Sequence, residues 1–331
     1  MATINLASAH CIVTGGAGLI GSYLVDHLVA RGIRVTVIDD LSKGKLSNLE
    51  TCSGKYSFRQ GDLEDRNFAC EALVDADVVF HLASRAFGVA YSANRHLQIL
   101  EHNERISTNL LEALRRNPPR ALLVTSSSCI YPDDGPETVP ELPVFVGEPE
   151  EVNLGYGGAK GILELKASLF EKETGVPTTV VRPFNIYGER YAWQGQYSQA
   201  IPMLVKRVMD GDDPLTIWGS GNQRRNYMHA DDCAWCMMRL VEEGVAGPIN
   251  IGTEETITMK ALVELICLKS GRAPAVMTDT SKPEGRFVKS ANSALLKKSI
   301  PDFRLSIDMD TGIGRMLGWY ASNDFSKELE K

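Results

Sequence analysis

The sequence lacks a surplus of basic residues, since 35 Lys and Arg stand against 42 Asp and Glu and give a net charge of −7. A chain without that surplus is poorly suited to a phosphate backbone, so we do not expect a nucleic-acid polymer as a partner. Long apolar runs are also missing, and the first residues, MATINLASAH, lack the basic stretch and apolar core of a secretory signal. We therefore expect neither a membrane-spanning segment nor a membrane partner.

A regular cysteine framework is absent as well. The cysteines are scattered, at Cys11, Cys52, Cys70, Cys129, Cys233, Cys236 and Cys267. An odd, irregular set is typical of a reducing compartment, so the cytoplasm is the expected location. Cys233 and Cys236 have the spacing of a redox pair or half a zinc site, but they fall within an apolar helical pattern and no second pair matches them. We expect both to pack in the core, and we expect no bound metal.

What the sequence does contain is an alternation of short apolar runs with helical patterns. The runs predict strands at 11–13, 35–39, 56–60, 78–81, 122–126 and 179–182. The patterns between them predict helices at 19–31, 65–74, 95–117 and 156–174. Such alternation is typical of βαβ units, so we predict an α/β fold of the Rossmann type, a doubly wound parallel sheet with helices on both faces.

The second half is more mixed and predicts a smaller C-terminal α/β lobe. A proline-rich, acidic segment at 132–155 predicts a loop beside a strand end, where binding residues often lie. Later patterns predict helices at 200–210, 231–243 and 258–270 and a strand at 215–218. We predict a first domain over residues 1–182 and a substrate lobe over 183–331, with 231–252 packing back on the first domain.

Gly15, Gly18 and Gly21 stand between the first predicted strand and the first predicted helix. Glycines in this place permit a tight turn and close backbone approach, and the helix N-terminus offers N–H groups to a pyrophosphate. Asp39 follows at the end of the second strand, near the spacing of a ribose-binding carboxylate. Because a carboxylate repels a 2′-phosphate, the pattern predicts NAD rather than NADP as the cofactor.

Further cofactor contacts are expected at the start of the first helix and where strands end, because ligands of open α/β sheets bind at the carboxyl ends of the strands. The segments GDL at 61–63 and HLAS at 81–84 end the third and fourth strands. His81 is interpreted as a packed strand-end residue. The expected contacts are Leu19, Ile20, Asp62, Leu63, Leu82 and Ser84.

Tyr156 and Lys160 begin the helix after the proline-rich loop and are four residues apart, which places both side chains on one face. An ammonium beside a phenol, with a positive nicotinamide close by, lowers the tyrosine pKa and makes a base for a sugar hydroxyl. Ser127 and its neighbours can hydrogen-bond the substrate oxygen. Gly157 and Gly158 each cost about 1 kcal/mol against alanine in a helix, so we expect the substrate to approach closely there.

Together these motifs resemble the extended short-chain dehydrogenase/reductase family of NAD-dependent nucleotide-sugar epimerases and dehydratases, over nearly the whole chain. The resemblance implies that Ser127 helps Tyr156 to orient the substrate oxygen. It also implies that Asn185 in RPFNIYG, Arg225 in RRNYMHADD and Arg286 in KPEGR hold the diphosphate of a nucleotide sugar, a role that suits guanidinium forks. A homodimer paired through the helices at 95–117 and 156–174 is implied too.

Within that family, SSSCIYP at 126–132 resembles most the GDP-mannose 3,5-epimerases. The similarity extends over HLASRAFGVAYSANRHLQILEHN. It implies substrate contacts at Gly88 and Ser128, and a cofactor contact at Asn103. The implied reaction epimerises a GDP-mannose-like hexose at C5, C3 or both, through a transient 4-keto sugar.

In the implied mechanism Tyr156 takes the C4 hydroxyl proton while hydride passes to NAD, and Cys129 is the base at C3 or C5. In those relatives a lysine is the acid that returns the proton, and Gln194 stands in the place of that lysine. An amide does not donate a proton at neutral pH. Another group such as Tyr191 or Tyr197, or water, would then be the acid, or one carbon alone would be epimerised.

Other interpretations remain open. Cys129 could be a small buried residue under the cofactor. Turning the 4-keto sugar would make the protein a nucleotide-sugar 4-epimerase, which needs no residue at 194. A 4,6-dehydratase is less favoured, since such relatives carry an Asp-Glu pair where this chain has Ser128 and Cys129. Outside enzymes, an idle NAD-binding sensor or scaffold is disfavoured by the intact set of Ser127, Tyr156 and Lys160.

Overall fold

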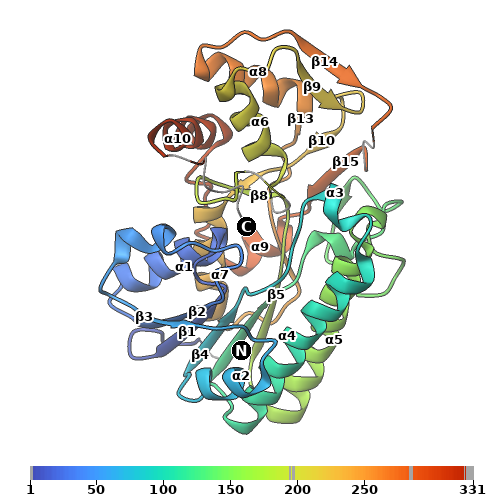
Figure 1. Ribbon diagram of the computed structural model, residues 1–331. Helices are drawn as coiled ribbons and strands as arrows, with labels where there is room; N and C mark the ends of the chain where they lie inside the picture. Colours follow the sequence, from blue (N-terminus) through green and yellow to red (C-terminus); the bar gives the residue numbers. More distant parts are fainter. Residues whose placement is uncertain (1–2, 194, 196–197, 283–285, 324, 326–331) are drawn as a thin grey trace.

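The computed structural model describes residues 3–193, 195, 198–282, 286–323 and 325. Within these residues seven parallel strands form one sheet, in the order β12-β7-β5-β4-β1-β2-β3 (Figure 1). The strands are β1 (His10–Thr14), β2 (Arg34–Asp39), β3 (Ser57–Gln60), β4 (Val78–His81), β5 (Ala121–Thr125), β7 (Thr178–Pro183) and β12 (Ile249–Ile251). The Rossmann-type sheet expected from the sequence is confirmed.

Helices cover both faces of this sheet (Figure 1). The helices of these layers are α1 (Leu19–Ala30), α2 (Arg66–Ala72), α4 (His96–Arg116), α5 (Leu154–Thr174) and α7 (Ala230–Glu242). Cys11 and Val13 share a core with α1 and α7, whereas Ile12 shares a core with α2, α4 and α5. Successive side chains of a strand point to opposite faces, so β1 contributes to both cores. The predicted elements of the first half are all present, with ends shifted by at most two residues.

A second group of elements forms the upper lobe of Figure 1. Its core is built by α6 (Ala200–Asp210), β9 (Leu215–Trp218), α8 (Met259–Ser270) and α10 (Met309–Ser322). Beside β9 lies β14 (Val276–Asp279). Two small sheets join the lobe to the rest, one of β13 (Ile257–Thr258), β10 (Arg224–Arg225), β15 (Val288–Ala291) and β6 (Thr138–Val139), the other of β8 (Ile186–Tyr187) and β11 (Met228–His229).

Several short elements were not expected from the sequence. The segment 132–155, predicted as a loop, contains β6, the 3-10 helix η3 (Glu151–Asn153) and the first two residues of α5. The edge strand β12 also went unpredicted, because its three residues are too few to show a periodicity. The remaining short helices are η1 (Leu46–Cys52), α3 (Val89–Ser92), η2 (Ser128–Ile130) and α9 (Ala294–Ser299).

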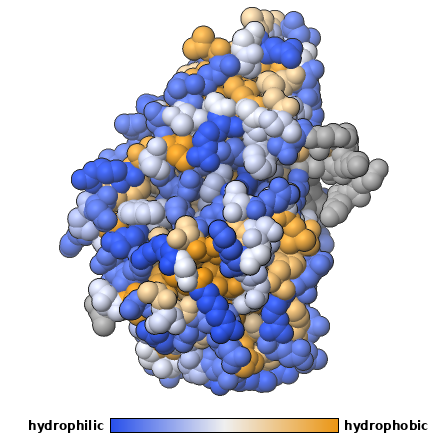
Figure 2. Space-filling model, turned by 90° about the vertical axis from the view of Figure 1, so that its left-hand side faces the viewer, coloured by the Kyte–Doolittle hydropathy of each residue, from blue (hydrophilic) through white to orange (hydrophobic). Residues whose placement is uncertain are grey.

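The segment at 230–251 contributes to the layers of the large sheet. The helix α7 packs against α1, and β12 pairs with β7. Cys233 and Cys236 lie fully buried in α7, as expected. Among the described residues no helix is both long and apolar enough to cross a membrane. Figure 2 shows one face of the molecule, on which hydrophilic side chains prevail and hydrophobic ones gather in small patches.

Candidate active site

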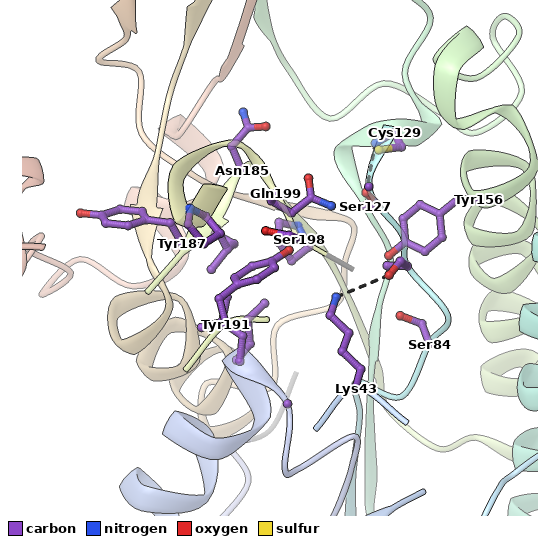
Figure 3. A pocket seen from close by; sticks show the side chains of 18 of the residues that line it. Lys43, Ser84, Ser127, Cys129, Tyr156, Asn185, Tyr187, Tyr191, Ser198 and Gln199 are labelled. Carbon is purple, nitrogen blue, oxygen red and sulfur yellow. Dashed lines mark hydrogen bonds between the residues drawn. The ribbon is translucent and has the colours of Figure 1, made fainter. Parts of the chain in front are cut away.

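A cavity of about 730 Å³ lies at the carboxyl ends of the sheet strands. The segments after β1, β4 and β5 line it together with the end of β2, and α6, β8, β9, β10 and β15 line it from the second lobe (Figure 3). Most residues predicted for the site contribute to its wall. They are Gly15, Gly18, Leu19, Ile20, Gly21, Asp39, Asp62, Leu63, Leu82, Ser84, Gly88, Ser127, Ser128, Cys129, Tyr156, Asn185 and Arg225.

The glycine loop forms a cradle at one end of this cavity. Gly15 has a φ of 69°, and a Cβ there would lie 2.7 Å from the backbone nitrogen of Ala83, so both conformation and space require glycine. A Cβ on Gly21 would collide with the carbonyl of Gly15. Gly18 is the N-cap of α1 and has no side chain to bind the first amides of the helix. Those N–H groups are therefore available to an anion.

Asp39 ends β2 with its carboxylate at the cavity wall. One oxygen accepts the Ala17 N–H at 3.0 Å and the other accepts the Leu41 N–H at 2.9 Å. Burial raises the pKa of this carboxyl, and the two N–H donors oppose that shift. Nearby, the Arg85 guanidinium bridges Asp40 at 2.8 Å and Asp62 at 2.9 Å. The end of the cavity beside β2 is thus built from carboxylates, which suit ribose hydroxyls better than a phosphate.

Tyr156 lines the cavity from the first turn of α5 (Figure 3). Lys160 follows one turn later on the same helix and does not line the cavity. The Lys160 Nζ is 5.5 Å from the Tyr156 ring centroid and donates to the Thr125 carbonyl at 2.8 Å. Burial lowers the pKa of Lys160 to about 7. Burial also raises the pKa of Tyr156, although hydrogen bonds with Ser84 and Ser127 oppose this. The sequence predicted a lowered Tyr156 pKa, whereas in the protein without a bound cofactor this pKa is raised.

Cys129 lies in η2, where the chain leaves β5, and lines the cavity close to Tyr156 (Figure 3). Ser127 caps this turn, since its Oγ accepts the Cys129 N–H at 3.1 Å. A Cβ on Gly157 would collide with the Cys129 carbonyl, and a Cβ on Gly158 would only touch Leu100 at 3.5 Å. The close approach that requires glycine at 157 is made by the main chain of η2, so the substrate approach expected there was wrong.

On the side of the second lobe, Asn185 and Arg225 line the cavity. Asn185 adopts a left-handed φ of 42°, and its Nδ2 donates to the Asn226 Oδ1 at 3.0 Å. Arg225 comes from β10, and its Nη1 donates to its neighbour's carbonyl, that of Arg224, at 2.9 Å. Both residues line the cavity, as a diphosphate-binding residue must. Their role in binding the diphosphate stays a prediction.

Three predicted residues stand behind the wall. Lys160 reaches the site through Tyr156 and Thr125, as described above. Asn103 is buried in α4, where its Oδ1 accepts the Arg85 N–H at 3.0 Å and its Nδ2 donates to the Arg85 carbonyl at 3.1 Å. Asn103 therefore holds the segment after β4 in place.

The Arg286 guanidinium donates to the carbonyls of Pro132, Gly135 and Pro136, so it would have to exchange partners to bind a diphosphate. Gln194 and Tyr197 lie outside the described residues.

A comparison with known protein families shows which family the chain matches. The sequence pattern of the NAD dependent epimerase/dehydratase family matches residues 11–252. The chain belongs to this family. The predicted family and the predicted cofactor, NAD, are thereby confirmed.

Relatives in the family carry out different reactions. The chain is 32% identical to a UDP-N-acetyl-alpha-D-glucosaminuronate decarboxylase of Bacillus cytotoxicus, over 94% of this chain and 97% of that one. It is 27% identical to GDP-mannose 3,5-epimerase 1 of Oryza sativa subsp. indica, over 87% of this chain and 75% of the relative. These similarities support an enzyme that acts on a nucleotide sugar. They do not distinguish epimerisation from decarboxylation.

Solved structures of the family share the fold. A UDP-glucose 4-epimerase of Thermotoga maritima, solved with UDP-glucose, superposes with a TM-score of 0.85 at 26% identity, over 95% of this chain and 99% of that one. A UDP-glucose 4-epimerase of Thermus thermophilus, solved with NAD, gives 0.83 at 26% identity, over 95% and 100%. The glycine cradle and the Asp39 carboxylate of this chain fit NAD, because the N-terminus of α1 has no side-chain cap and can bind a pyrophosphate, and a carboxylate at the end of β2 can accept hydrogen bonds from ribose hydroxyls.

Sequence reasoning missed several charged residues of the wall, among them Lys43, Glu150 and Lys289. Lys43 follows Asp39 by four residues, and its Nζ lies 5.2 Å from the Tyr191 ring centroid and 3.5 Å from the Ala86 carbonyl (Figure 3). Glu150 could have been suspected from the acidic loop. Lys289 carried no signal, because it reaches the cavity only through the pairing of β15 with β10 and β6.

Proposed function

We propose that the protein is an NAD-dependent nucleotide-sugar epimerase that works through a transient 4-keto sugar and inverts C5, C3 or both in a GDP-mannose-like hexose. The observation that carries this proposal is the meeting of Tyr156, Ser127 and Cys129 at the wall of one cavity that also contains the glycine cradle. A hydroxyl base and a thiol within one site suit oxidation followed by chemistry at the neighbouring carbon.

The roles follow from the positions of the side chains. Tyr156 would accept the proton of the C4 hydroxyl, and Ser127, which hydrogen-bonds Tyr156, would hold the same oxygen. Lys160 would place positive charge behind the phenol. Bound NAD would supply a hydride acceptor and later return the hydride. Once C4 is a ketone, the hydrogens on C3 and C5 are acidic, and Cys129 is the wall residue that would handle their protons.

The nucleotide sugar would bind across the cavity. Asn185 and Arg225 would hold its diphosphate, since an amide and a guanidinium both donate to phosphate oxygens. Gly88 and Ser128 would face the sugar. The lack of a basic surplus argues against a polymeric anion, and the cavity of about 730 Å³ has room for a small substrate.

Deuterium incorporation tests this function. Purified protein with NAD would be mixed in deuterated water with GDP-mannose and, separately, with UDP-, dTDP-, ADP- and CDP-sugars, and followed by NMR. Deuterium at C5 or C3 together with an inverted product is the expected result. In the Cys129→Ser variant this exchange should vanish while NAD binding is retained. A 4-epimer without deuterium would establish the 4-epimerase instead, and no change with any sugar would leave an NAD-binding sensor or scaffold.

A decarboxylase is the second candidate, favoured by the similarity to the Bacillus cytotoxicus enzyme. Oxidation at C4 of a sugar acid makes a β-keto acid, which loses carbon dioxide and leaves an enolate that needs one proton at C5. The reaction needs no acid at position 194. Release of carbon dioxide from a UDP-sugar acid, followed in the same NMR screen as loss of C6, would decide for this candidate.

A further inference from the structure

The side chain of Lys43 reaches from the loop after β2 to two other segments of the cavity wall. Its Nζ lies 3.5 Å from the carbonyl oxygen of Ala86, in the segment after β4. The same Nζ lies 5.2 Å from the ring centroid of Tyr191, in the segment after β8. Figure 3 shows the side chain pointing into the cavity, which all three residues line. The ammonium is thus placed inside the candidate site.

The loop that carries Lys43 is fixed against the glycine cradle. A Cβ on Gly44 would lie 2.8 Å from the carbonyl carbon of Ala17 and 2.9 Å from the Asp39 carboxylate, so position 44 has no room for a side chain. The Lys45 N–H donates to the carbonyl oxygen of Ala17 at 3.1 Å. Because Ala17 lies between the cradle glycines in the sequence, these contacts hold the main chain of Lys43 beside the cradle.

The segment after β8 borders the same cradle. The Asn48 Nδ2 donates to the carbonyl oxygen of Ala17 at 2.9 Å and to the carbonyl oxygen of Arg190 at 3.3 Å. Tyr191 is therefore joined to the cradle through the main chain of its neighbour, and its ring lies next to the Lys43 ammonium. Both the loop of Lys43 and the segment of Tyr191 are thus fixed to one residue of the cradle.

A cation in this place suits the diphosphate of the cofactor. The N-terminus of α1 offers N–H groups and a partial positive charge, whereas a diphosphate carries two full negative charges. The other cations of the described wall start from different places. Three come from α6, β10 and β15, namely Arg207, Arg225 and Lys289. Arg85 is held by Asp40 and Asp62 at the end of the cavity beside β2. Lys43 is the wall cation whose own loop packs on the cradle.

We propose that Lys43 is a further cofactor-binding residue, whose ammonium pairs with the diphosphate of bound NAD. A lysine suits this role because its ammonium is a compact charge on a flexible stem. The aromatic face of Tyr191 would stabilise the same ammonium from the second lobe. This assignment rests on NAD as the cofactor of the family, and it is independent of which sugar is bound and which reaction follows.

Calorimetric binding of NAD and of ADP-ribose, without any sugar, tests the assignment. ADP-ribose keeps the diphosphate and lacks the nicotinamide. Lys43→Met should raise the Kd of both ligands about tenfold or more, because a contact between full charges is lost, whereas Lys43→Arg keeps the charge and should stay within about threefold. Raising the salt concentration from about 0.05 M to about 0.5 M should weaken NAD binding in the wild type more than in Lys43→Met.

Matched controls keep the test decisive. Lys55→Met removes an exposed lysine of the same domain and should leave both Kd values unchanged. Lys43→Gln is a second uncharged variant and should show the same loss as Lys43→Met. The melting temperature without ligand shows that each variant is folded. Wild-type Kd values for NAD and ADP-ribose in either folded, uncharged variant of Lys43 would overturn the proposal, and so would an equal loss in Lys55→Met.

The carboxylate of a sugar acid is the competing anion for Lys43. UDP-glucuronic acid and UDP-glucose differ by that carboxylate, so their Kd values would be compared in the wild type and in Lys43→Met at saturating NAD. A loss confined to UDP-glucuronic acid, with NAD binding intact, would overturn the cofactor role and assign Lys43 to the substrate. No sugar has to be converted in the NAD titrations. Wild-type protein that acts on no nucleotide sugar would therefore defeat the proposed function and leave the assignment of Lys43 standing.

Discussion

Arg182 on β7 and Glu164 on α5 form a buried, two-point ion pair, with Nε to Oε1 at 2.8 Å and Nη2 to Oε2 at 2.6 Å. The pair joins the helix of Tyr156 to the segment of Cys129. Glu164 also accepts the hydroxyl of Ser126, and the Arg182 Nη1 donates to the Tyr131 hydroxyl at 2.7 Å. The two halves of the candidate active site thus share one support.

Breaking this support should destabilise the fold. Arg182→Met leaves the Glu164 charge buried without its partner, so we expect a loss of about 3–5 kcal/mol in the free energy of unfolding. Urea unfolding followed by circular dichroism measures it. Arg115→Met removes an exposed pair with Glu173 and should cost at most about 1 kcal/mol. Equal costs in the two variants would contradict the support assigned to Arg182.

Tyr156→Phe should remove turnover. The variant keeps the ring but loses the hydroxyl that takes the C4 proton, so we expect kcat to fall by at least about a hundredfold while NAD binding is unchanged. The NMR assay gives the rate, and calorimetry gives the affinity for NAD. Tyr227→Phe alters another tyrosine of the same wall and should stay within about threefold of the wild type. A fully active Tyr156→Phe protein would refute the assigned role.

Lys160 should make stability depend on pH. Its pKa is about 7 in the fold and 10.5 ordinarily, so between these values the unfolded chain binds more protons and stability rises with pH. The free energy of unfolding of Lys160→Met minus that of the wild type, both without NAD, should therefore decrease from pH 7 to pH 9. Lys172→Met, an exposed change on the same helix, gives the control difference, which should be flat. A flat difference for Lys160→Met would show that the ammonium is not disfavoured by burial.

We propose that the protein is a homodimer paired through α4 and α5. The outer face of α5 exposes Leu165 by 45% and Leu169 by 47%, and Leu97 of α4 is 70% exposed. Leu169→Glu should shift the protein from dimer to monomer in light scattering after size exclusion. Leu268→Glu changes an exposed leucine of α8 and should leave the mass unchanged. A wild-type monomer at micromolar concentration would contradict the prediction.

Much of the fold and of the cofactor site could be predicted from the sequence, because their signals are local. The alternation of apolar runs with helical patterns predicted the central strands and helices of the large sheet. Gly15 has a positive φ, Gly21 is required by its contact with Gly15 within the same βαβ unit, and Asp39 ends the next strand. Tyr156 and Lys160 share a helix turn. Such features are settled by residues within about thirty positions of each other.

The tertiary structure decided how the candidate site is charged. Lys289 lies 139 residues from Glu150 in the sequence, and only the pairing of β15 brings it to Cys129. Burial raises the pKa of Cys129, which opposes the thiolate expected from the sequence, and it also raises the pKa of Tyr156, which the sequence predicted to be low. Desolvation and the contacts of distant strands depend on the whole fold, and no spacing of residues along the chain encodes them.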